Sequence, residues 1–227
     1  MKLLTLNIRC IYIMLTDYLE KKGIRFSYDY EGYSGQFPAE EVILSHFASR
    51  PEVKEIMEIG FNAGHSAENF LLANPNANVT SFDLGRVNAM QHGKEYIDAT
   101  YPGRHTLIVG DSRQTVWQYK IDNPNKRFDL IFIDGGHTYD VAKVDIVHSS
   151  GLAHSDTIVI VDDIMYVSGW EAGWTVAPTK VWDEGKKFGE IQELGRVADR
   201  PGIGLVWGKY LRSFGTDGVF HTIPPHP

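Results

Sequence analysis

The sequence has only one cysteine, Cys10, so no disulfide can form within the chain. A single cysteine fits a reducing compartment, and we expect a cytoplasmic protein. The apolar fraction of 43% is ordinary for a soluble globular protein and can supply a continuous core. The length of 227 residues suits one sizeable domain over 1–227 and is too short for two full ones.

The sequence also lacks an excess of positive charge. Lys and Arg number 22 against 29 Asp and Glu, which gives a formal net charge of -7. A partner with a phosphate backbone would favour a basic face, so we expect no nucleic-acid partner. The absence of an Asn-Pro-Pro-Tyr motif points the same way. A localised basic groove inside an acidic total stays open.

No hydrophobic run is long enough to span a bilayer. The first fifteen residues are apolar, but Arg9 interrupts them and they fall short of the ~20 residues that a spanning helix needs. No small-residue cleavage site follows, so we predict neither a membrane anchor nor a signal peptide. We expect a segment that packs on the core or on a partner subunit, which leaves a homo-oligomer open. Met14 is an alternative start.

Short apolar runs rich in β-branched and aromatic residues alternate with amphipathic stretches. Runs of this kind are typical of strands whose two faces are covered by helices. The alternation predicts an α/β fold, a doubly wound Rossmann-like sheet. The predicted strands are Glu55–Ile59, Val79–Phe82, Thr106–Val109, Asp129–Ile133 and Thr157–Val161, and the predicted helices between them are Ser66–Ala73, Val87–Tyr101 and Val141–Ser149.

The pattern is looser at both ends of the chain. Residues 1–34 suggest an N-terminal helical or cap segment, and 165–178 suggest an active-site loop with glycines and tryptophans. Further on we expect a helix over Val181–Phe188, a late strand over Gly202–Trp207 and an extended tail over 222–227.

Acidic residues or glycines stand at nearly every predicted strand end. They are Glu58 with Gly60, then Asp83, Asp111, Asp134, and Asp162 with Asp163. In open α/β sheets, ligands bind outside the carboxyl ends of the strands. The sequence therefore predicts one rim that carries the chemistry.

A glycine turn follows the first strand. Gly60 and Gly64 allow the backbone to approach a ligand closely, and the amides at the following helix start attract a carboxylate. The spacing lacks the glycine triplet that holds a dinucleotide pyrophosphate, which argues against an NAD-dependent oxidoreductase. An acid about 20 residues later, Asp83, suits two ribose hydroxyls, and Asp111 with Ser112 suits an adenine amino group. Each of these residues could instead be a helix cap.

Asp134, Asp162 and Asp163 are predicted to converge, because neighbouring parallel strands lie ~4.8 Å apart. Crowded carboxylates raise their pKa values or share a cation, and oxygen ligands suit a hard ion such as Mg²⁺. His137 follows Asp134 by three residues and is a candidate general base. The alternative is that Asp163 caps the next segment and no metal binds.

Three stretches together resemble the class I methyltransferases, and within them the metal-dependent O-methyltransferases that act on catechols, antibiotics and sugars. They are Met57–Ser66, Phe128–His137 and Ile158–Ile164. The resemblance implies a seven-stranded sheet with an antiparallel last strand, S-adenosylmethionine as cofactor, and Mg²⁺ or Mn²⁺ held by Asp134, Asp162 and Asp163. The cofactor-binding residues that it implies are Glu58, Gly60, Asn62, Gly64, Ser66, Asp83, Asp111, Ser112 and Asp134.

The expected reaction is methylation of a hydroxyl on a small molecule or glycan, with His137 and Asp134 as catalytic residues. Catechol enzymes have a lysine where this sequence has His137, so we favour a sugar with vicinal hydroxyls over a phenol. The aromatic residues of the two variable segments could stack on either; they are Tyr28, Tyr30, Tyr33, Phe37, Tyr166, Trp170 and Trp174. A non-catalytic cofactor-binding subunit is the alternative from another class.

Overall fold

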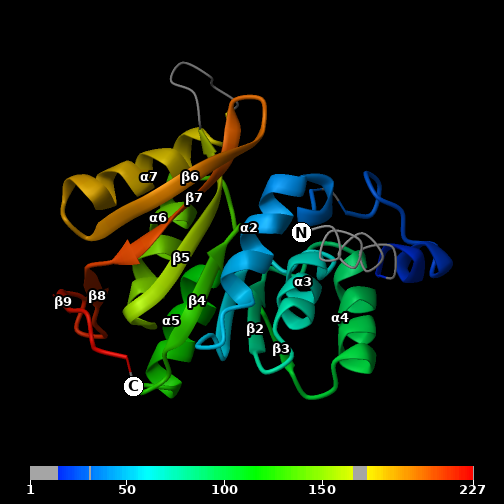
Figure 1. Cartoon of the computed structure of the whole chain (residues 1–227), viewed down its shortest axis with the longest axis horizontal. Helices are drawn as coiled ribbons and strands as arrows, with labels where there is room; N and C mark the ends of the chain where they lie inside the picture. Colours follow the sequence, from blue (N-terminus) through cyan, green and yellow to red (C-terminus); the bar gives the residue numbers. More distant parts are fainter. Residues whose placement is uncertain (1–14, 31, 166–172, 227) are drawn as a thin grey trace.

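The structure is a computed structural model that describes residues 15–30, 32–165 and 173–226 (Figure 1). Its centre is a seven-stranded sheet with the order β3-β2-β1-β4-β5-β7-β6. The strands are β1 Glu55–Ile59, β2 Asn78–Asp83, β3 His105–Val109, β4 Phe128–Ile133, β5 Ala153–Met165, β6 Ile191–Arg200 and β7 Ile203–Tyr210. The first five are parallel, and β7 runs antiparallel between β5 and β6. The doubly wound fold and its antiparallel last strand are therefore confirmed.

Helices cover both faces of this sheet (Figure 1). They are η1 Ser34–Gln36, α2 Pro38–Ala48, α3 His65–Ala73, α4 Ala89–Thr100, α5 Ser112–Asp122, α6 Tyr139–Ser150 and α7 Val176–Lys187, and residues 15–21 are also helical. A short hairpin of β8 Arg212–Phe214 and β9 Phe220–Thr222 follows the sheet.

Side-chain alternation along the strands divides the core into two layers. Ile56 of β1 packs with Leu44 of α2 and Phe70 of α3 in one cluster. The next residue, Met57, packs in the other cluster, which contains Val116 of α5 and Trp182 of α7. Successive strand residues point to opposite faces, so one continuous apolar run fills both layers.

Several predicted boundaries differ from the observed ones. Asp162 and Asp163 lie inside β5, which continues to Met165, and not beyond the strand end. Of the predicted loop 165–178, residues 166–172 lie outside the described residues and 176–178 belong to α7. The predicted tail begins within β9, and its residues 223–226 have no regular structure.

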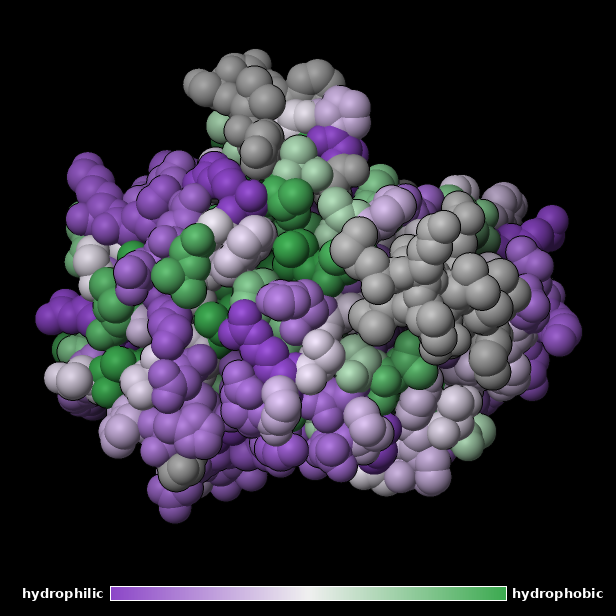
Figure 2. Space-filling model, viewed as in Figure 1, coloured by the Kyte–Doolittle hydropathy of each residue, from purple (hydrophilic) through white to green (hydrophobic). Residues whose placement is uncertain are grey.

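The surface is mostly hydrophilic in Figure 2, with apolar side chains visible beside α2, over the β5–β7 part of the sheet. There the Trp207 ring of β7 packs 5.8 Å from that of Phe47 on α2. No helix among the described residues has the length and apolar character that crossing a bilayer requires. The homo-oligomer stays a prediction.

Candidate active site

The carboxyl ends of β1 to β4 open into a cavity of about 990 Å³. This volume lies at the upper end of the range that small-molecule sites occupy. The cavity is lined by the loops after these strands, by residues inside β5, and by parts of η1, α2 and β6. The rim predicted from the strand ends is therefore a real concave site.

The glycine turn after β1 forms the floor of this cavity. Gly60 has φ +102°, and a Cβ there would lie 2.0 Å from the carbonyl oxygen of Asp134. Gly64 has φ +95°, and a Cβ there would lie 2.8 Å from the Phe61 ring. Only glycine fits either position, which brings the turn close against β4. Gly60 lines the cavity, whereas Gly64 is not among its lining residues.

Glu58 lies behind the turn and is fully buried. Ser81 Oγ donates to Glu58 Oε2 at 2.6 Å, and Ser66 Oγ donates to Glu58 Oε1. Burial raises the pKa of Glu58 to about 7, although both serines oppose the shift. Neither Glu58 nor Ser66 lines the cavity, so these two predicted cofactor residues support the turn from behind.

Asp83 connects the loops after β1 and β2. Its Oδ2 accepts a hydrogen bond from the Asn62 amide at 2.9 Å, and its Oδ1 accepts one from the Gly85 amide at 2.7 Å. Asn62 has φ +50°, and its side-chain amide donates to the Gly32 carbonyl at 2.8 Å. Asp83 and Asn62 both line the cavity, so an acid and a backbone turn are fixed together at its edge.

Asp111 is the N-cap of α5, and its side chain accepts from the Arg113 amide at 3.0 Å. The Arg113 guanidinium also binds this carboxylate and holds the pKa of Asp111 below its usual range. The helix-cap alternative is thus realised. Asp111 and Ser112 nevertheless line the cavity, so the cap does not remove them from the site.

Asp134, His137 and Asp163 form the acidic end of the cavity. One potential ligand atom from each lies within 4.8 Å of the others. His137 Nε2 lies 2.8 Å from Asp163 Oδ2. Asp163 has φ +56° at an irregularity of β5, which turns its side chain from the regular alternation. Asp162 is 6% exposed and lines the same cavity but lies outside this trio.

Two charged residues of this end had no sequence signal. Arg200 Nη2, from the end of β6, lies 2.8 Å from Asp163 Oδ1 and 3.6 Å from Asp162 Oδ1. Its guanidinium carbon is 4.2 Å from the Phe37 ring centroid. Glu40 of α2 also lines the cavity and is 3% exposed. Asp162 and Asp163 therefore already share one positive charge, the guanidinium of Arg200.

Burial and the neighbouring Asp163 charge raise the pKa of Asp134 well above its usual range. The charge of Glu40 adds to this rise, and Arg200 opposes it. Like charges in a shared site penalise the ionised form. An added cation would relieve the same repulsion.

The aromatic segments contribute unequally. Tyr33, Phe37 and Trp174 line the cavity, whereas Tyr28 is 87% exposed and is not part of the lining. Tyr30 is buried and stacks on the His65 ring at 5.5 Å. Tyr166 and Trp170 lie outside the described residues.

His65 belongs to this buried aromatic group and does not line the cavity. It is 2% exposed, and burial lowers its pKa to about 3, so the imidazole stays neutral.

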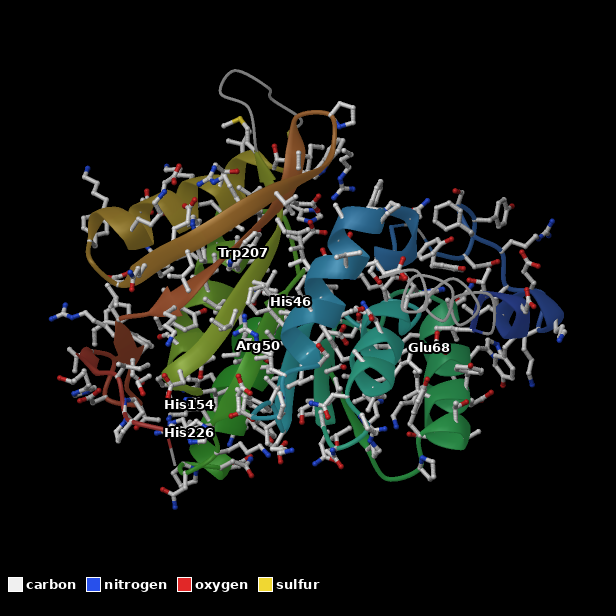
Figure 3. All side chains as sticks on the ribbon, viewed as in Figure 1. His46, Arg50, Glu68, His154, Trp207 and His226 are labelled. Atoms are coloured by element: carbon white, nitrogen blue, oxygen red, sulfur yellow. The ribbon has the colours of Figure 1, made fainter. Side chains whose placement is uncertain are left out.

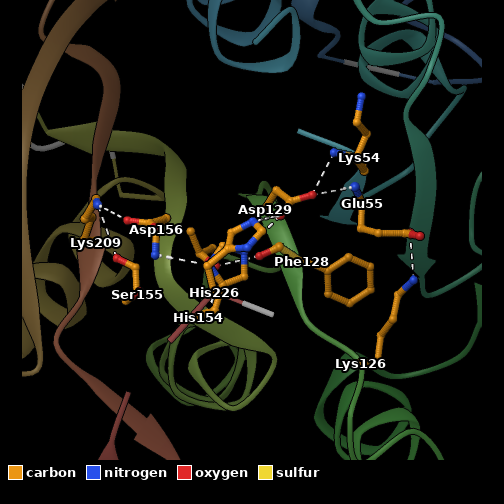
Figure 4. A network of polar contacts seen from close by, with 11 residues as sticks. Lys54, Glu55, Lys126, Phe128, Asp129, His154, Ser155, Asp156, Lys209 and His226 are labelled. Atoms are coloured by element: carbon orange, nitrogen blue, oxygen red, sulfur yellow. Dashed lines mark hydrogen bonds and ion pairs between the residues drawn. The ribbon is translucent and has the colours of Figure 1, made fainter. Parts of the chain in front are cut away.

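A second cluster lies at the opposite, amino edge of the sheet, where Figure 3 labels His154 and His226. His154 Nε2 lies 3.0 Å from Asp129 Oδ1, and His226 Nε2 lies 3.5 Å from the same atom (Figure 4). Two imidazoles and a carboxylate are a common metal-ligand set.

The hydrogen bonds of His154 argue against a metal there. Its Nδ1 accepts from the Asp156 amide at 3.1 Å, so the ring proton is on Nε2. That nitrogen donates to Asp129 and has no lone pair for an ion. Asp129 also accepts hydrogen bonds from the Lys54 and Glu55 amides, so the cluster connects the starts of β4 and β1.

Comparison with known proteins gives the same picture as the geometry. Residues 57–164 match a family model described as a methyltransferase domain. No sequence among curated proteins matches the chain.

Solved structures resemble it closely in fold. One from Klebsiella pneumoniae, described as an O-methyltransferase, has a TM-score of 0.66 at 16% identity over 88% of this chain and 89% of that one. An O-methyltransferase of Bacillus cereus in complex with SAH has a TM-score of 0.64 at 15% identity, over 76% and 81%. A TDP-rhamnose 3'-O-methyltransferase of calicheamicin biosynthesis has 0.58 at 18% identity, over 74% and 78%.

At these identities the likeness establishes the shared fold, and the family model adds a sequence similarity over residues 57–164. The matched segment contains the glycine turn, His137, and the three aspartates Asp134, Asp162 and Asp163. The chain therefore has a Rossmann-like seven-stranded sheet, and residues 57–164 of it are similar to a methyltransferase domain.

Proposed function

We propose that the protein is an S-adenosylmethionine-dependent O-methyltransferase that uses a divalent cation to methylate a hydroxyl of a small molecule or glycan. The observation that carries the proposal is one cavity in which the glycine turn lies against the loop after β4, next to the Asp134, His137 and Asp163 trio. A sulfonium cofactor and a metal-activated hydroxyl need this adjacency, because the methyl group must lie in line with the attacking oxygen.

The cofactor end offers groups suited to each part of S-adenosylmethionine. The Gly60 backbone can approach the methionine part, since no side chain intervenes. The Asp83 carboxylate accepts two backbone amides and keeps lone pairs for ribose hydroxyls. Asp111 and Ser112 line the same cavity and would hold the adenine.

The residues at the acidic end fit a hard divalent ion. Asp134 and Asp163 supply carboxylate oxygens, and Asp162 lines the same wall. Carboxylates with water or substrate are the ligands that Mg²⁺ and Mn²⁺ prefer. When bound, such an ion would stabilise the alkoxide of a coordinated hydroxyl.

His137 is suited to accept the hydroxyl proton. Its Nε2 faces Asp163 Oδ2, and a carboxylate can only accept, so the free lone pair is on Nδ1. Proton transfer to Nδ1 would give an imidazolium that the Asp163 charge stabilises. In this arrangement Asp163 orients the base as well as offering an oxygen to the ion.

A sugar with vicinal hydroxyls is the proposed acceptor class, with a phenol of the catechol type second. Tyr33, Phe37 and Trp174 line the cavity, and aromatic faces of this kind can stack on a sugar ring. The structural likeness to a TDP-rhamnose 3'-O-methyltransferase supports this choice. Two adjacent hydroxyls would chelate the ion and fix which one reacts.

The test begins with calorimetric titration of the protein with S-adenosylmethionine, NAD and Mn²⁺. We expect the first and last to bind. Asp163→Asn tolerates the left-handed backbone but removes a charge, and Asp134→Ala removes a ligand. Both variants should weaken Mn²⁺ binding at least tenfold while cofactor affinity stays within a few-fold. Asp183→Asn, an exposed acid of α7, is the matched control.

Turnover is then followed as S-adenosylhomocysteine formed with a panel of vicinal-diol sugars and catechols. EDTA should abolish it, and His137→Ala should lower it by ~10²-fold or more without loss of Mn²⁺ binding. Binding of NAD alone would remove the proposal. Full activity in EDTA would leave a metal-free methyltransferase with the His137–Asp163 pair as its base.

A further inference from the structure

A second pocket of about 410 Å³ lies between the end of α5, the start of β4 and the β8–β9 hairpin. It shares no lining residue with the active-site cavity. Helix α5 runs antiparallel to the strands, so its last turn lies at the amino edge of the sheet, opposite the catalytic rim. The methyltransferase chemistry makes no use of this pocket.

Two partly buried cations, Lys120 and Arg127, line this pocket. Lys120 is 8% exposed, and within the described part of the chain it has no hydrogen bond or ion pair. Arg127 Nη1 donates to the carbonyls of Pro124 and Lys126 at 2.9 and 2.7 Å and so fixes the loop before β4. Its buried Nε has no acceptor among the described residues. Lysine is almost never buried without a partner.

No carboxylate belongs to the pocket lining. The nearest acids along the chain, Asp122 and Asp217, are exposed. Asp122 accepts from Gln118 Nε2 at 2.8 Å, and Asp217 lies 2.9 Å from His221 Nε2. Hydroxyl donors complete the wall, and they come from Ser213, Thr216 and Thr222.

We propose that this pocket binds an oxyanion, the phosphate group of a phosphomonoester, between Lys120 and Arg127. A dianion matches the two cations in charge, and the hydroxyls can donate to its remaining oxygens. A volume of about 410 Å³ exceeds what a bare phosphate fills, so space remains for the esterified group.

Titration behaviour of the lysine supports this assignment. Burial, with a smaller contribution from the charge of Arg127, lowers the pKa of Lys120 to about 8. A bound anion would reverse both effects, because it pairs the ammonium and screens the guanidinium.

The test is calorimetric and thermal-shift titration of the full chain at pH 7.5 and constant ionic strength. The probes are inorganic phosphate and glycerol 3-phosphate, with chloride as the reference. We expect saturable binding of both phosphates, tighter for the ester, and a rise in Tm that chloride does not give. Lys120→Met and Arg127→Gln should each weaken binding at least tenfold. Lys187→Met, an exposed lysine at the end of α7, should change it less than twofold.

Lys120→Met should also unfold at a higher temperature than the wild type without phosphate, because it removes a partly buried charge that the charge of Arg127 repels. This comparison of unfolding temperatures needs no ligand. Equal phosphate binding by Lys120→Met and the wild type would overturn the proposal, as would a Tm rise no larger than that in chloride. Tighter binding of inorganic phosphate than of the ester would assign the pocket to the free ion and overturn the phosphomonoester.

Discussion

Glu58 is an acid whose environment works against its charge. It is fully buried, and its carboxyl group is held by Ser66 and Ser81. The Ser81 oxygen lies 2.9 Å from His105 Nε2, so the group continues to β3. Burial lowers the pKa of His105 to about 3, so this imidazole is neutral and adds no positive charge. Glu58 therefore supports the glycine turn through hydrogen bonds. Its ionisation should lower the free energy of unfolding.

We predict that Glu58→Gln removes part of the pH dependence of folding. The native pKa of about 7 exceeds the ordinary value of 4.5, so the native state holds a proton that the unfolded state releases. The free energy of unfolding should fall as pH rises from 4.5 to 7, by at most roughly 3 kcal/mol. Urea unfolding at pH 5 and pH 8 measures this fall. It should be smaller in Glu58→Gln and unchanged in Glu52→Gln, an exposed control; an equal fall in all three proteins would contradict the assignment.

Site residues could be predicted best from the sequence where their position on a strand determines their place in space. Gly60, Asp83 and Asp134 follow strand ends, and parallel strands bring such positions to one rim. Arg200 could not be found this way. It reaches Asp163 from β6, 37 residues later, and nothing local in the sequence encodes that contact.

Helix α4 shows why element boundaries and packing are separate problems. The predicted helix Val87–Tyr101 contains the observed Ala89–Thr100, yet its Gly93 would count against it by propensity. The structure supplies the reason. A Cβ on Gly93 would lie 1.9 Å from the carbonyl oxygen of Ala63, inside the glycine turn.

We therefore predict that Gly93→Ala destabilises the protein by about 1–3 kcal/mol through overpacking, although helix propensity alone favours alanine by ~1 kcal/mol. Because the clash is with the turn, cofactor affinity should fall too. Gly185→Ala in α7 is the control, since its Cβ would meet the Ile191 side-chain end, which can move. Urea unfolding and calorimetry measure both effects; a Gly93→Ala protein as stable as the wild type would show that α4 can shift away.

Two elements that were not predicted, α5 and β6, have weak sequence patterns for physical reasons. Helix α5 buries only Val116 and Lys120, so it shows little apolar periodicity. Strand β6 lies at the sheet edge and contains charged residues along its length, which hides it from a search for buried runs. Helix α2, also not predicted, has a clear start signal, because Pro38 stands at its first position and Glu40 and Glu41 follow in the first turn.

At the scale of the whole molecule, the active-site cavity joins segments from most of the chain. Its lining runs from Gly32 to Arg200 and takes residues from the loops after four parallel strands. A ligand that fills it should couple these segments, because binding to the native state alone stabilises everything that must unfold together. The β8–β9 hairpin lies outside this set and pairs only with itself in the described sheets.

Hydrogen exchange with and without S-adenosylhomocysteine should reveal this coupling. At a ligand concentration of about 100 times Kd, the native state gains roughly 2.7 kcal/mol, which lowers the population of the open state about a hundredfold. We expect protection to rise together in peptides covering 60–64, 83–87, 110–113 and 134–138, and to stay unchanged in 212–222. Protection confined to 60–64 would mean that the nucleoside does not reach the later strand ends. The cavity would then bind only a fragment of the cofactor that the proposed chemistry requires.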